Sequence, residues 1–434
     1  MKIVCTSERH ANGGPGEFLL ARAEAALPGL IGQYRGRVQL IYLDPPFGTG
    51  DTFHVRIGTG KKALSLPAFS DDMDEPRYLS WMREILSGVR ELLCDSGSLY
   101  LHIDYRMSAK LRLLLDEIFG EQNFMNEIVW CYKSGGRSTR YYPRKHDTIL
   151  FYRKSSKVYF DIQAVGRPRG PEKRNHMKRY IDEDGRICFS IHSAGKLYTY
   201  YENTPVYPSD VWDDIEHLQQ KDAERVGYAT QKPEALLNRV ILASSRPGDL
   251  VCDLFSGSGT TAAAASKLGR RFLAVDASPF SLYTLRARQL KAMSARSLLE
   301  GDQELILRYP ADDTPARITA RIVTVHGKRM LSIEEAVFSE EAVFSEEALF
   351  LEEAAFSEEV GFSEKTAFSE EAAFSPVSPL IYAAAGTVRD GCFCPATTDC
   401  RPKLPLQLPI GEIENPVLQI TDAMGHTAFF TLSS

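Results

Sequence analysis

The sequence predicts an α/β protein whose core is a doubly wound, mostly parallel sheet. Apolar runs of strand length alternate with amphipathic helical segments, as in parallel sheets covered by helices. Two of these runs end in an acidic residue, at Asp44 and at Asp276. The carboxyl ends of parallel strands meet at one edge, where open sheets of this kind bind ligands. The 434 residues, 44% of them hydrophobic, suffice for one large or two ordinary domains.

The N-terminal part of the chain contains the first of these elements. A helix is expected from about Glu17 to Leu27, followed by a buried strand over residues 38–43. Further along we expect a polar, Gly-rich loop at 48–68, a helix at 78–93, a strand at 98–103, a helix at 107–119, and strands at 126–132 and 148–152.

The alternation of helices and apolar strands resumes after a polar, basic and turn-rich stretch over residues 155–225. A helix at 233–245 precedes a buried strand at 249–255, an Ala-rich helix that ends near Leu268 and a strand at 271–275. Near the C-terminus, 417–420 and 428–432 read as strands of a small β unit.

The tetrapeptide Asp44-Pro45-Pro46-Phe47 follows directly on the first buried strand. Prolines have a fixed φ and lack N–H donors, so the carbonyls of Asp44 and Pro45 point outward in a rigid geometry. Acceptors beside a flat aromatic ring suit an exocyclic amine on a planar base. For the tetrapeptide taken alone, an ordinary strand end with a proline turn is the competing interpretation.

A second motif lies between residues 249 and 276. The strand runs into Ser256-Gly257-Ser258-Gly259-Thr260, whose glycines permit a tight turn and a close approach of the backbone to a ligand. The next strand ends in Asp276, and an acidic residue about 20 positions after such a loop can bind ribose hydroxyls. The unit predicts a site for an adenosine-containing cofactor. It also fits a dinucleotide fingerprint, so an NAD-dependent oxidoreductase is an alternative.

The net charge of −6 conceals two opposite regions. Residues 334–375 carry thirteen Glu and one Lys, so the rest of the chain is positive. Residues 131–180 contain fourteen Lys and Arg against three Asp and Glu, interleaved with aromatic residues. This combination favours binding to phosphates and unstacked bases, whereas a solvated face with core aromatics is the alternative.

The acidic region is a hexapeptide repeat, Glu-Glu-Ala-x-Phe-Ser, that occurs about seven times. A period of six places no continuous stripe on a helix. A stacked hexapeptide coil is conceivable, but an expanded, weakly ordered insert is favoured.

The apolar runs and the cysteines indicate in which cellular compartment the protein is expected. No apolar run is long enough to span a bilayer, and no signal peptide is recognised. The eight cysteines are scattered, which indicates a reducing, cytoplasmic setting. Cys392, Cys394 and Cys400 cluster without a clear fourth ligand, so no metal is expected.

With both motifs placed, residues 27–295 resemble the DNA amino-methyltransferases of the permuted β class, which modify adenine N6 or cytosine N4. In that class a D-P-P-Y/F motif comes first, a target-recognition segment next and an F-x-G-x-G loop last, and here Asp44–Phe47 precedes the basic segment, which precedes Phe255–Gly259. Thr230-Gln231-Lys232-Pro233 matches the segment that completes the family's cofactor pocket, and residues 96–104 and 144–152 also look like family segments. Type III modification subunits and related solitary adenine enzymes are the nearest groups.

The resemblance implies a Rossmann-like fold, S-adenosylmethionine as cofactor, and double-stranded DNA as substrate, with a restriction subunit as a possible partner in a prokaryotic cytoplasm. Asp44, Pro45, Pro46 and Phe47 would act on a flipped adenine, with cytosine N4 as the alternative target. A DNA-binding module that has lost catalysis is a further alternative, against which the intact Asp44 argues. The cofactor would contact Asp253, Phe255, Gly257, Gly259, Thr260, Asp276, Gln231 and Lys232, and the DNA would contact Arg137, Arg140, Arg144 and Lys145.

The same resemblance suggests the domain organisation. A catalytic half over 1–130 is followed by a target-recognition region over 131–225 and a cofactor-binding half over 226–331. The acidic repeats over 332–376 and a β extension over 377–434 follow. Two departures from the family are visible: Met1–Gly16 lacks the usual opening strand motif, and Phe47 replaces the commoner Tyr.

Overall fold

The computed structural model describes most of the chain. The described residues are 3–11, 16–48, 52–57, 64–70, 73–133, 138–170, 176–219, 221–228, 230–294, 302–310, 316–325, 328–338, 380–389, 392–399, 406–409, 413, 416–422 and 427–431.

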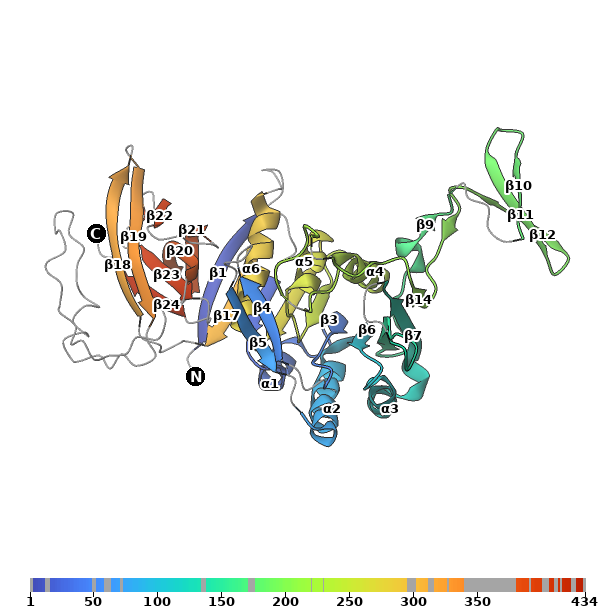
Figure 1. Cartoon of the computed structure of the whole chain (residues 1–434), viewed down its shortest axis with the longest axis horizontal. Helices are drawn as coiled ribbons and strands as arrows, with labels where there is room; N and C mark the ends of the chain where they lie inside the picture. The colour runs from blue at the N-terminus through green and yellow to red at the C-terminus, as the bar shows by residue number, and fades with distance from the viewer. Residues whose placement is uncertain are drawn as a thin grey trace.

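One large sheet runs through the molecule, and its central strands are parallel (Figure 1). Ile41 of the buried strand β3 lies between Leu99 of β6 and Cys252 of β15. This arrangement confirms the predicted α/β class with a mostly parallel sheet. The central parallel strands, in spatial order, are β6 (Leu93–Ile103), β3 (Val38–Leu43), β15 (Leu250–Asp253), β16 (Arg271–Asp276) and β2 (Gly16–Leu20), and the next strand beyond β2 is also parallel to it.

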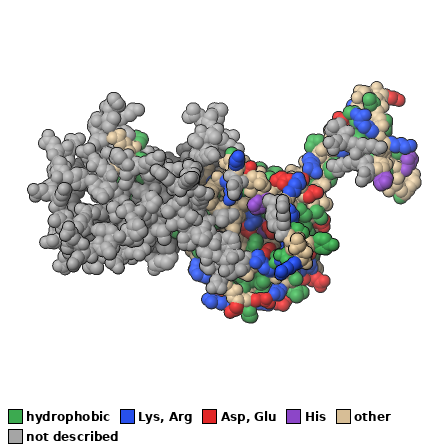
Figure 2. All heavy atoms as spheres, in the orientation of Figure 1, with side chains coloured by type: hydrophobic (Ala, Val, Ile, Leu, Met, Phe, Trp, Pro, Cys, Tyr) green, Lys and Arg blue, Asp and Glu red, His purple; other side chains and the backbone are tan. Residues whose placement is uncertain are grey.

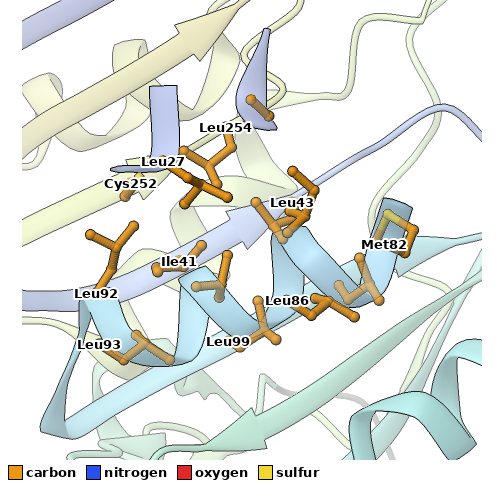
Figure 3. Close-up of a cluster of buried hydrophobic side chains, with 14 of the residues drawn as sticks. Leu27, Ile41, Leu43, Met82, Leu86, Leu92, Leu93, Leu99, Cys252 and Leu254 are labelled. Carbon is orange, nitrogen blue, oxygen red and sulfur yellow. The ribbon is translucent and has the colours of Figure 1, made fainter. Parts of the chain in front are cut away.

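Three helices cover one face of the parallel strands. They are α1 (Ala23–Tyr34), α2 (Glu75–Leu92) and α3 (Ser108–Phe119). Helix α2 begins where the carboxylate of Asp74 accepts a hydrogen bond from the backbone N–H of Arg77. Met82 and Leu86 of α2, one helical turn apart, pack with Leu27 of α1 against the strand β3, as Figure 3 shows.

The opposite face is covered by α4 (Glu234–Ser244), α5 (Thr260–Lys267) and α6 (Pro279–Ser294). Leu237 of α4, Ala264 of α5 and Leu285 of α6 are buried in one cluster with Leu40 and Val251 of the sheet. Helices on both faces make the sheet doubly wound, as the alternating sequence pattern predicts.

Among the described residues, three further strands extend the sheet beyond β6. The strand β8 (His146–Arg153) pairs with β6, β7 (Phe124–Cys131) pairs with β8, and β14 (Val211–Trp212) pairs with β7. Strand β8 is antiparallel to both of its neighbours, whereas the last strand, β14, is parallel to β7. Because β8 runs antiparallel to β6, with Thr148 opposite Ile103, the start of β8 lies at the edge where the parallel strands end.

A separate three-stranded sheet projects from the body beyond β7 and β14 (Figure 1). It consists of β10 (Lys178–Ile181), β11 (Ile187–Ser193) and β12 (Lys196–Tyr201), and we call it the projecting sheet. Its connection to the body is a two-stranded ribbon in which β9 (Arg167–Pro168) pairs with β13 (Pro205–Val206). Two short 3-10 helices, at Glu121–Asn123 and Ile162–Val165, precede β7 and β9.

On the other side of the parallel core, β17 (Asp302–Pro310) pairs with β2 and continues the sheet through β1 (Ile3–Ala11). The same sheet continues through β21 (Cys392–Asp399), β20 (Leu380–Arg389), β23 (Val417–Asp422) and β24 (Thr427–Thr431). A second sheet contains β18 (Ala316–Val325), β19 (Lys328–Phe338) and β22 (Leu406–Pro409). The C-terminal strands expected near 417 and 428 are present, whereas most of the acidic repeat lies outside the described residues.

Two sequence predictions were wrong. The helix expected at Glu17–Leu27 is instead strand β2 followed by α1, because β2 pairs with β16 and β17 from distant parts of the chain. The loop expected at 48–68 contains a hairpin of β4 (Thr52–Ile57) and β5 (Leu64–Ser70). The other expected elements are present with slightly different ends. None of the described helices combines the length and hydropathy needed to cross a membrane.

Candidate active site

A cavity of about 450 Å³ lies at the edge of the sheet where β3, β15 and β16 end. Its volume is within the range of small-molecule sites, roughly 300–1,000 Å³. Both sequence motifs contribute to its wall, although they are about two hundred residues apart. The lining residues that the sequence singled out are Asp44, Pro46, Lys232, Asp253, Phe255, Gly257, Thr260 and Asp276.

The turn at Asp44–Phe47 is held from two sides. Tyr78 of α2 donates a hydrogen bond from its hydroxyl to the carbonyl of Pro46, at 2.7 Å. The ring of Phe47 stacks on the imidazole of His102, with centroids 6.2 Å apart and planes inclined by 20°. Pro45 is buried, and Phe47 is partly exposed. The turn therefore has a fixed position at the C-terminal end of β3, and the ring of Phe47 remains partly accessible on it.

His102 is completely buried and makes two polar contacts with the strands around it. Its Nδ1 is 2.7 Å from the hydroxyl of Tyr42, and its Nε2 is 3.1 Å from the carboxylate of Asp147. The other oxygen of Asp147 accepts a hydrogen bond from Tyr132 at 3.2 Å. This network joins β3, β6 and β8 to Tyr132, the residue that follows β7, next to Phe47. Sequence analysis does not identify His102 as a site residue, because its contacts come from strands that are far apart in the chain.

Asp253 organises the glycine-rich loop from inside. Its carboxylate accepts hydrogen bonds from the backbone N–H of Phe255 at 3.0 Å and from the hydroxyl of Thr261 at 2.6 Å. Burial raises the pKa of Asp253 to about 7, although these hydrogen bonds act in the opposite direction. Asp253 therefore shapes the loop and also lines the cavity.

Gly259 explains the close approach of the loop to α6. Its φ is +75°, and a Cβ at this position would lie 3.0 Å from the Cβ of Leu285. A side chain here would be strained and would collide with α6. Gly259 is not among the residues that line the cavity, so its part is to let Thr260 begin α5 beside the cavity.

Asp276 closes the other side of the loop. One carboxylate oxygen accepts a hydrogen bond from the backbone N–H of Gly257 at 2.6 Å, and the other accepts one from Ser278 at 2.8 Å. Burial raises the pKa of Asp276 to about 6 against the effect of these backbone donors. A carboxylate has further acceptor capacity beyond two hydrogen bonds, so Asp276 can still receive hydroxyl groups from the cavity that it lines.

Gln231 and Lys232 are neighbours in the chain, but only Lys232 reaches the cavity. Gln231 is buried, where its side chain accepts from the N–H of Val226 and donates to the carbonyl of Glu224. It stabilises its own loop and is not among the cavity-lining residues. Lys232 lines the cavity, and its ammonium lies 2.5 Å from the carboxylate of Asp44.

The structure adds lining residues that sequence analysis missed. Tyr228 is buried beside the glycine-rich loop, and Trp81 of α2 meets the ring of Phe255 with centroids 5.6 Å apart. The indole of Trp81 donates to Glu24 in the first turn of α1. Arg22 and Glu24 were missed because a helix was expected where β2 ends. Arg22 and Glu24, at the junction of β2 and α1, therefore form part of the cavity wall.

The basic residues assigned to DNA lie on the connection between β7 and β8. Arg140 and Arg144 are exposed, and the side chain of Arg144 lies over the rings of Tyr105 and Tyr141 at 4.1 and 4.6 Å from their centroids. Lys145 donates to the carbonyl of Lys133, and Arg137 lies outside the described residues. Figure 2 shows Lys and Arg side chains on the body and along the connection to the projecting sheet, mixed with acidic and apolar ones.

The chain matches known proteins over the region that contains this cavity. The profile of the N6/N4 methyltransferase family, described as DNA methylase, matches residues 38–285. The type II methyltransferase M.EcaI of Enterobacter cloacae is 30% identical over 63% of this chain and 69% of its own length. The DNA adenine methyltransferase YhdJ of Escherichia coli is 30% identical over 55% and 71%, respectively. A probable type III HindVI Mod subunit of Haemophilus influenzae is 24% identical over 68% and 52%.

The family match spans more than half of the chain and includes both motifs. It overturns the alternative of an NAD-dependent oxidoreductase. The cavity fits the cofactor that the motifs imply, because a glycine-rich loop, a strand-end carboxylate and an aromatic wall surround a volume of suitable size. The chain therefore belongs to the N6/N4 DNA methylase family and is a DNA methyltransferase that uses S-adenosylmethionine.

Proposed function

We propose that this enzyme methylates the N6 amine of a flipped adenine at a specific site in double-stranded DNA. The observation that carries the proposal is that Asp44 lines the same cavity as Gly257 and Asp276. An amine acceptor and a cofactor loop in one cavity permit direct transfer, in which alignment of the two reactants supplies most of the rate.

Asp44 and Pro45 provide the acceptors for the amine. The lone pair of an adenine amine is delocalised into the ring, which makes the nitrogen a poor nucleophile. Acceptance of one N–H by Asp44 and of the other by the carbonyl of Pro45 localises that lone pair toward the methyl group. The nitrogen then forms the new bond to carbon and releases one proton, which the carboxylate of Asp44 is placed to accept.

Phe47 provides the surface on which the base stacks. Its partly exposed ring is fixed by His102 on one side, so the other side can receive a planar ring. A base inside a duplex cannot reach this cavity, and the target nucleotide has to rotate out of the helix first. The broad face of Phe47 suits a purine.

S-adenosylmethionine supplies a methyl group on a positively charged sulfur, and the sulfur keeps the electron pair of the broken bond. Asp276 would receive the ribose hydroxyls, while the backbone of Phe255 and Gly257 would pass along the cofactor. The residues Gly259 and Gln231 would act indirectly, by shaping the loops that hold the cofactor.

The basic connection between β7 and β8 and the projecting sheet would engage the duplex. Arg137, Arg140, Arg144 and Lys145 supply positive charge for phosphates, and the projecting sheet reaches beyond the body in the predicted target-recognition region, 131–225. The likeness to a Mod subunit also suggests a restriction subunit as partner, within a prokaryotic cytoplasm.

Adenine is preferred to cytosine for two reasons. In the family, an Asp at the position of Asp44 is associated with adenine and a Ser with cytosine, and a relative with 30% identity is a DNA adenine methyltransferase. The test is incubation of the enzyme with tritiated S-adenosylmethionine and unmethylated DNA, followed by chromatography of the nucleosides. We expect label in N6-methyladenine. Label in N4-methylcytosine alone would overturn the choice of base, and no label in DNA would favour a catalytically inactive DNA-binding module.

A further inference from the structure

Lys232 and Asp44 form an ion pair inside the active site. The Lys232 ammonium is 2.5 Å from Oδ2 of Asp44, and the two side chains are only 12% and 16% exposed. The ammonium also lies 5.5 Å from the centroid of the Phe47 ring. Lys232, which was expected to contact the cofactor, is thus directed toward the residues that would hold the base.

The backbone of Lys232 is anchored to the cofactor side of the cavity. The hydroxyl of Thr260 donates to the carbonyl of Lys232 at 3.2 Å, and Arg288 donates to that hydroxyl at 2.9 Å. The side chain of Gln231 fixes the preceding turn through two hydrogen bonds to its own loop. The base of the lysine side chain is therefore fixed relative to α5, and the ammonium is fixed relative to β3.

A carboxylate that is bound at one oxygen has its other oxygen in a defined direction. With Oδ2 engaged by the ammonium, Oδ1 of Asp44 keeps its full acceptor capacity and is the oxygen that we assign to an amine hydrogen. A pair of two buried charges also has a narrow range of geometries, because separation of the charges inside the protein is costly. Removal of Lys232 would leave a largely buried carboxylate that can rotate toward other donors.

We propose that Lys232 is a positioning residue for Asp44 and that its ammonium is not a ligand of the cofactor. The inference rests on the proposed function, since it assigns Oδ1 of Asp44 to the target amine. Lys232 sets the orientation of the carboxylate in the transfer step, and the hydrogen bond from Thr260 transmits the position of the glycine-rich loop to that carboxylate.

Lys232→Met, Lys232→Arg and the wild type test this role through two separate measurements. Calorimetry without DNA gives the Kd for S-adenosylmethionine, and single-turnover methylation of unmethylated DNA at saturating cofactor gives the rate of transfer. We expect Lys232→Met to keep a Kd within about twofold of the wild type and to lose at least about tenfold in rate, the usual effect of removing a charge-assisted hydrogen bond. Lys232→Arg should recover part of that rate, because it retains a cation near Asp44.

A matched control is Lys110→Met, which removes an exposed ion pair with Glu75 on the outer helices and should leave both quantities unchanged. A raised Kd in Lys232→Met would assign the ammonium to the cofactor and overturn the proposal, as would an unchanged transfer rate. Thermal denaturation checks that each variant is folded. If Lys232→Met is not folded, Lys232→Gln replaces it in the same two measurements. A wild type that methylates no DNA would overturn the proposed function, whereas an active wild type with an equally active Lys232→Met would overturn this inference alone.

Discussion

The ring of Phe47 stacks on the imidazole of His102, and two polar contacts hold that imidazole in position. The centroids are 6.2 Å apart, and the imidazole contacts Tyr42 through Nδ1 and Asp147 through Nε2. Burial acts to raise the pKa of Asp147, but hydrogen bonding and charge from His102 hold it below its usual range. Asp147 is therefore ionised and can only accept, so Nε2 of His102 carries the hydrogen that joins the two groups. The imidazole cannot rotate without breaking both contacts.

The stack predicts that His102→Ala impairs the DNA-dependent step alone. Without the imidazole, Phe47 loses the ring that fixes its plane, and we expect kcat/KM for DNA to fall by about tenfold or more. The Kd for S-adenosylmethionine should not change. His102→Asn retains polar contacts without an aromatic ring, so a normal rate in that variant would show that stacking is unimportant. Steady-state kinetics with varied DNA concentration measure the effect.

Asp44→Asn is predicted to lose at least about a hundredfold in methyl transfer, because the amide is a weaker acceptor for the amine hydrogen. Asp44→Ala should be inactive as well, but it leaves the ammonium of Lys232 largely buried without its partner. Binding of S-adenosylmethionine, measured by calorimetry, should persist in Asp44→Asn. Retention of more than a few per cent of wild-type turnover in either variant would remove Asp44 from its assigned role.

Binding of S-adenosylmethionine should weaken at low pH. The pKa of Asp276 is raised to about 6, so the carboxyl group gains a proton as the pH falls through that value and loses acceptor capacity for ribose hydroxyls. The Kd should therefore increase between pH 7 and pH 5. Asp276→Asn should bind more weakly at pH 7 and show a flatter pH profile, while NAD should bind to neither protein. Asp253, with a pKa of about 7, titrates nearby, and the comparison with Asp276→Asn separates the two.

The same two groups affect the stability of the protein. Their pKa values are higher in the folded chain than the ordinary value of 3.8, so between pH 7 and pH 4 the folded state binds more protons than the unfolded state. Their contribution to the free energy of unfolding therefore increases as the pH falls through this window. Paired carboxylates with lowered pKa values, such as Asp147 and Asp214, act in the opposite direction at lower pH.

Salt dependence tests the basic connection between β7 and β8. Replacement of Arg137, Arg140, Arg144 and Lys145 by Gln should flatten the slope of log affinity against log salt concentration by roughly 0.9 for each phosphate that is no longer neutralised. Filter binding or fluorescence anisotropy at several salt concentrations gives the slope. The variant should still bind S-adenosylmethionine. An identical slope in variant and wild type would place the phosphate-binding residues elsewhere.

Deletion of the acidic repeats should leave catalysis intact. Residues 339–375 follow the end of β19 and contain most of the repeat, and none of them belongs to a predicted motif. Because their Glu residues repel phosphates, DNA affinity at low salt should be equal or higher after deletion. A folded deletion variant that no longer methylates DNA would show that the repeats take part in the reaction.

The strands that carry the site could be predicted because their signals are local. Residues 38–43 and 250–253 are continuous apolar runs that end in an acid, and such runs indicate buried parallel strands. Strand β2 could not be predicted in this way, because its five residues become a strand only by pairing with β16 and β17. The contact between Lys232 and Asp44 joins residues 188 positions apart, and no local pattern encodes it. The roles assigned to the individual site residues remain predictions.

The two-stranded ribbon of β9 and β13 joins the beginning and the end of the segment that contains the projecting sheet, residues 169–204. Arg167 lies opposite Val206, and Pro168 lies opposite Pro205, so the chain leaves the body and returns to it at one point. A segment that leaves and returns at one point can change in length without interruption of β3 and β16, which lead to Asp44 and Asp276. The architecture therefore separates the projecting sheet from the catalytic chemistry: a change in the length or sequence of residues 169–204 leaves the strands of the cavity in place.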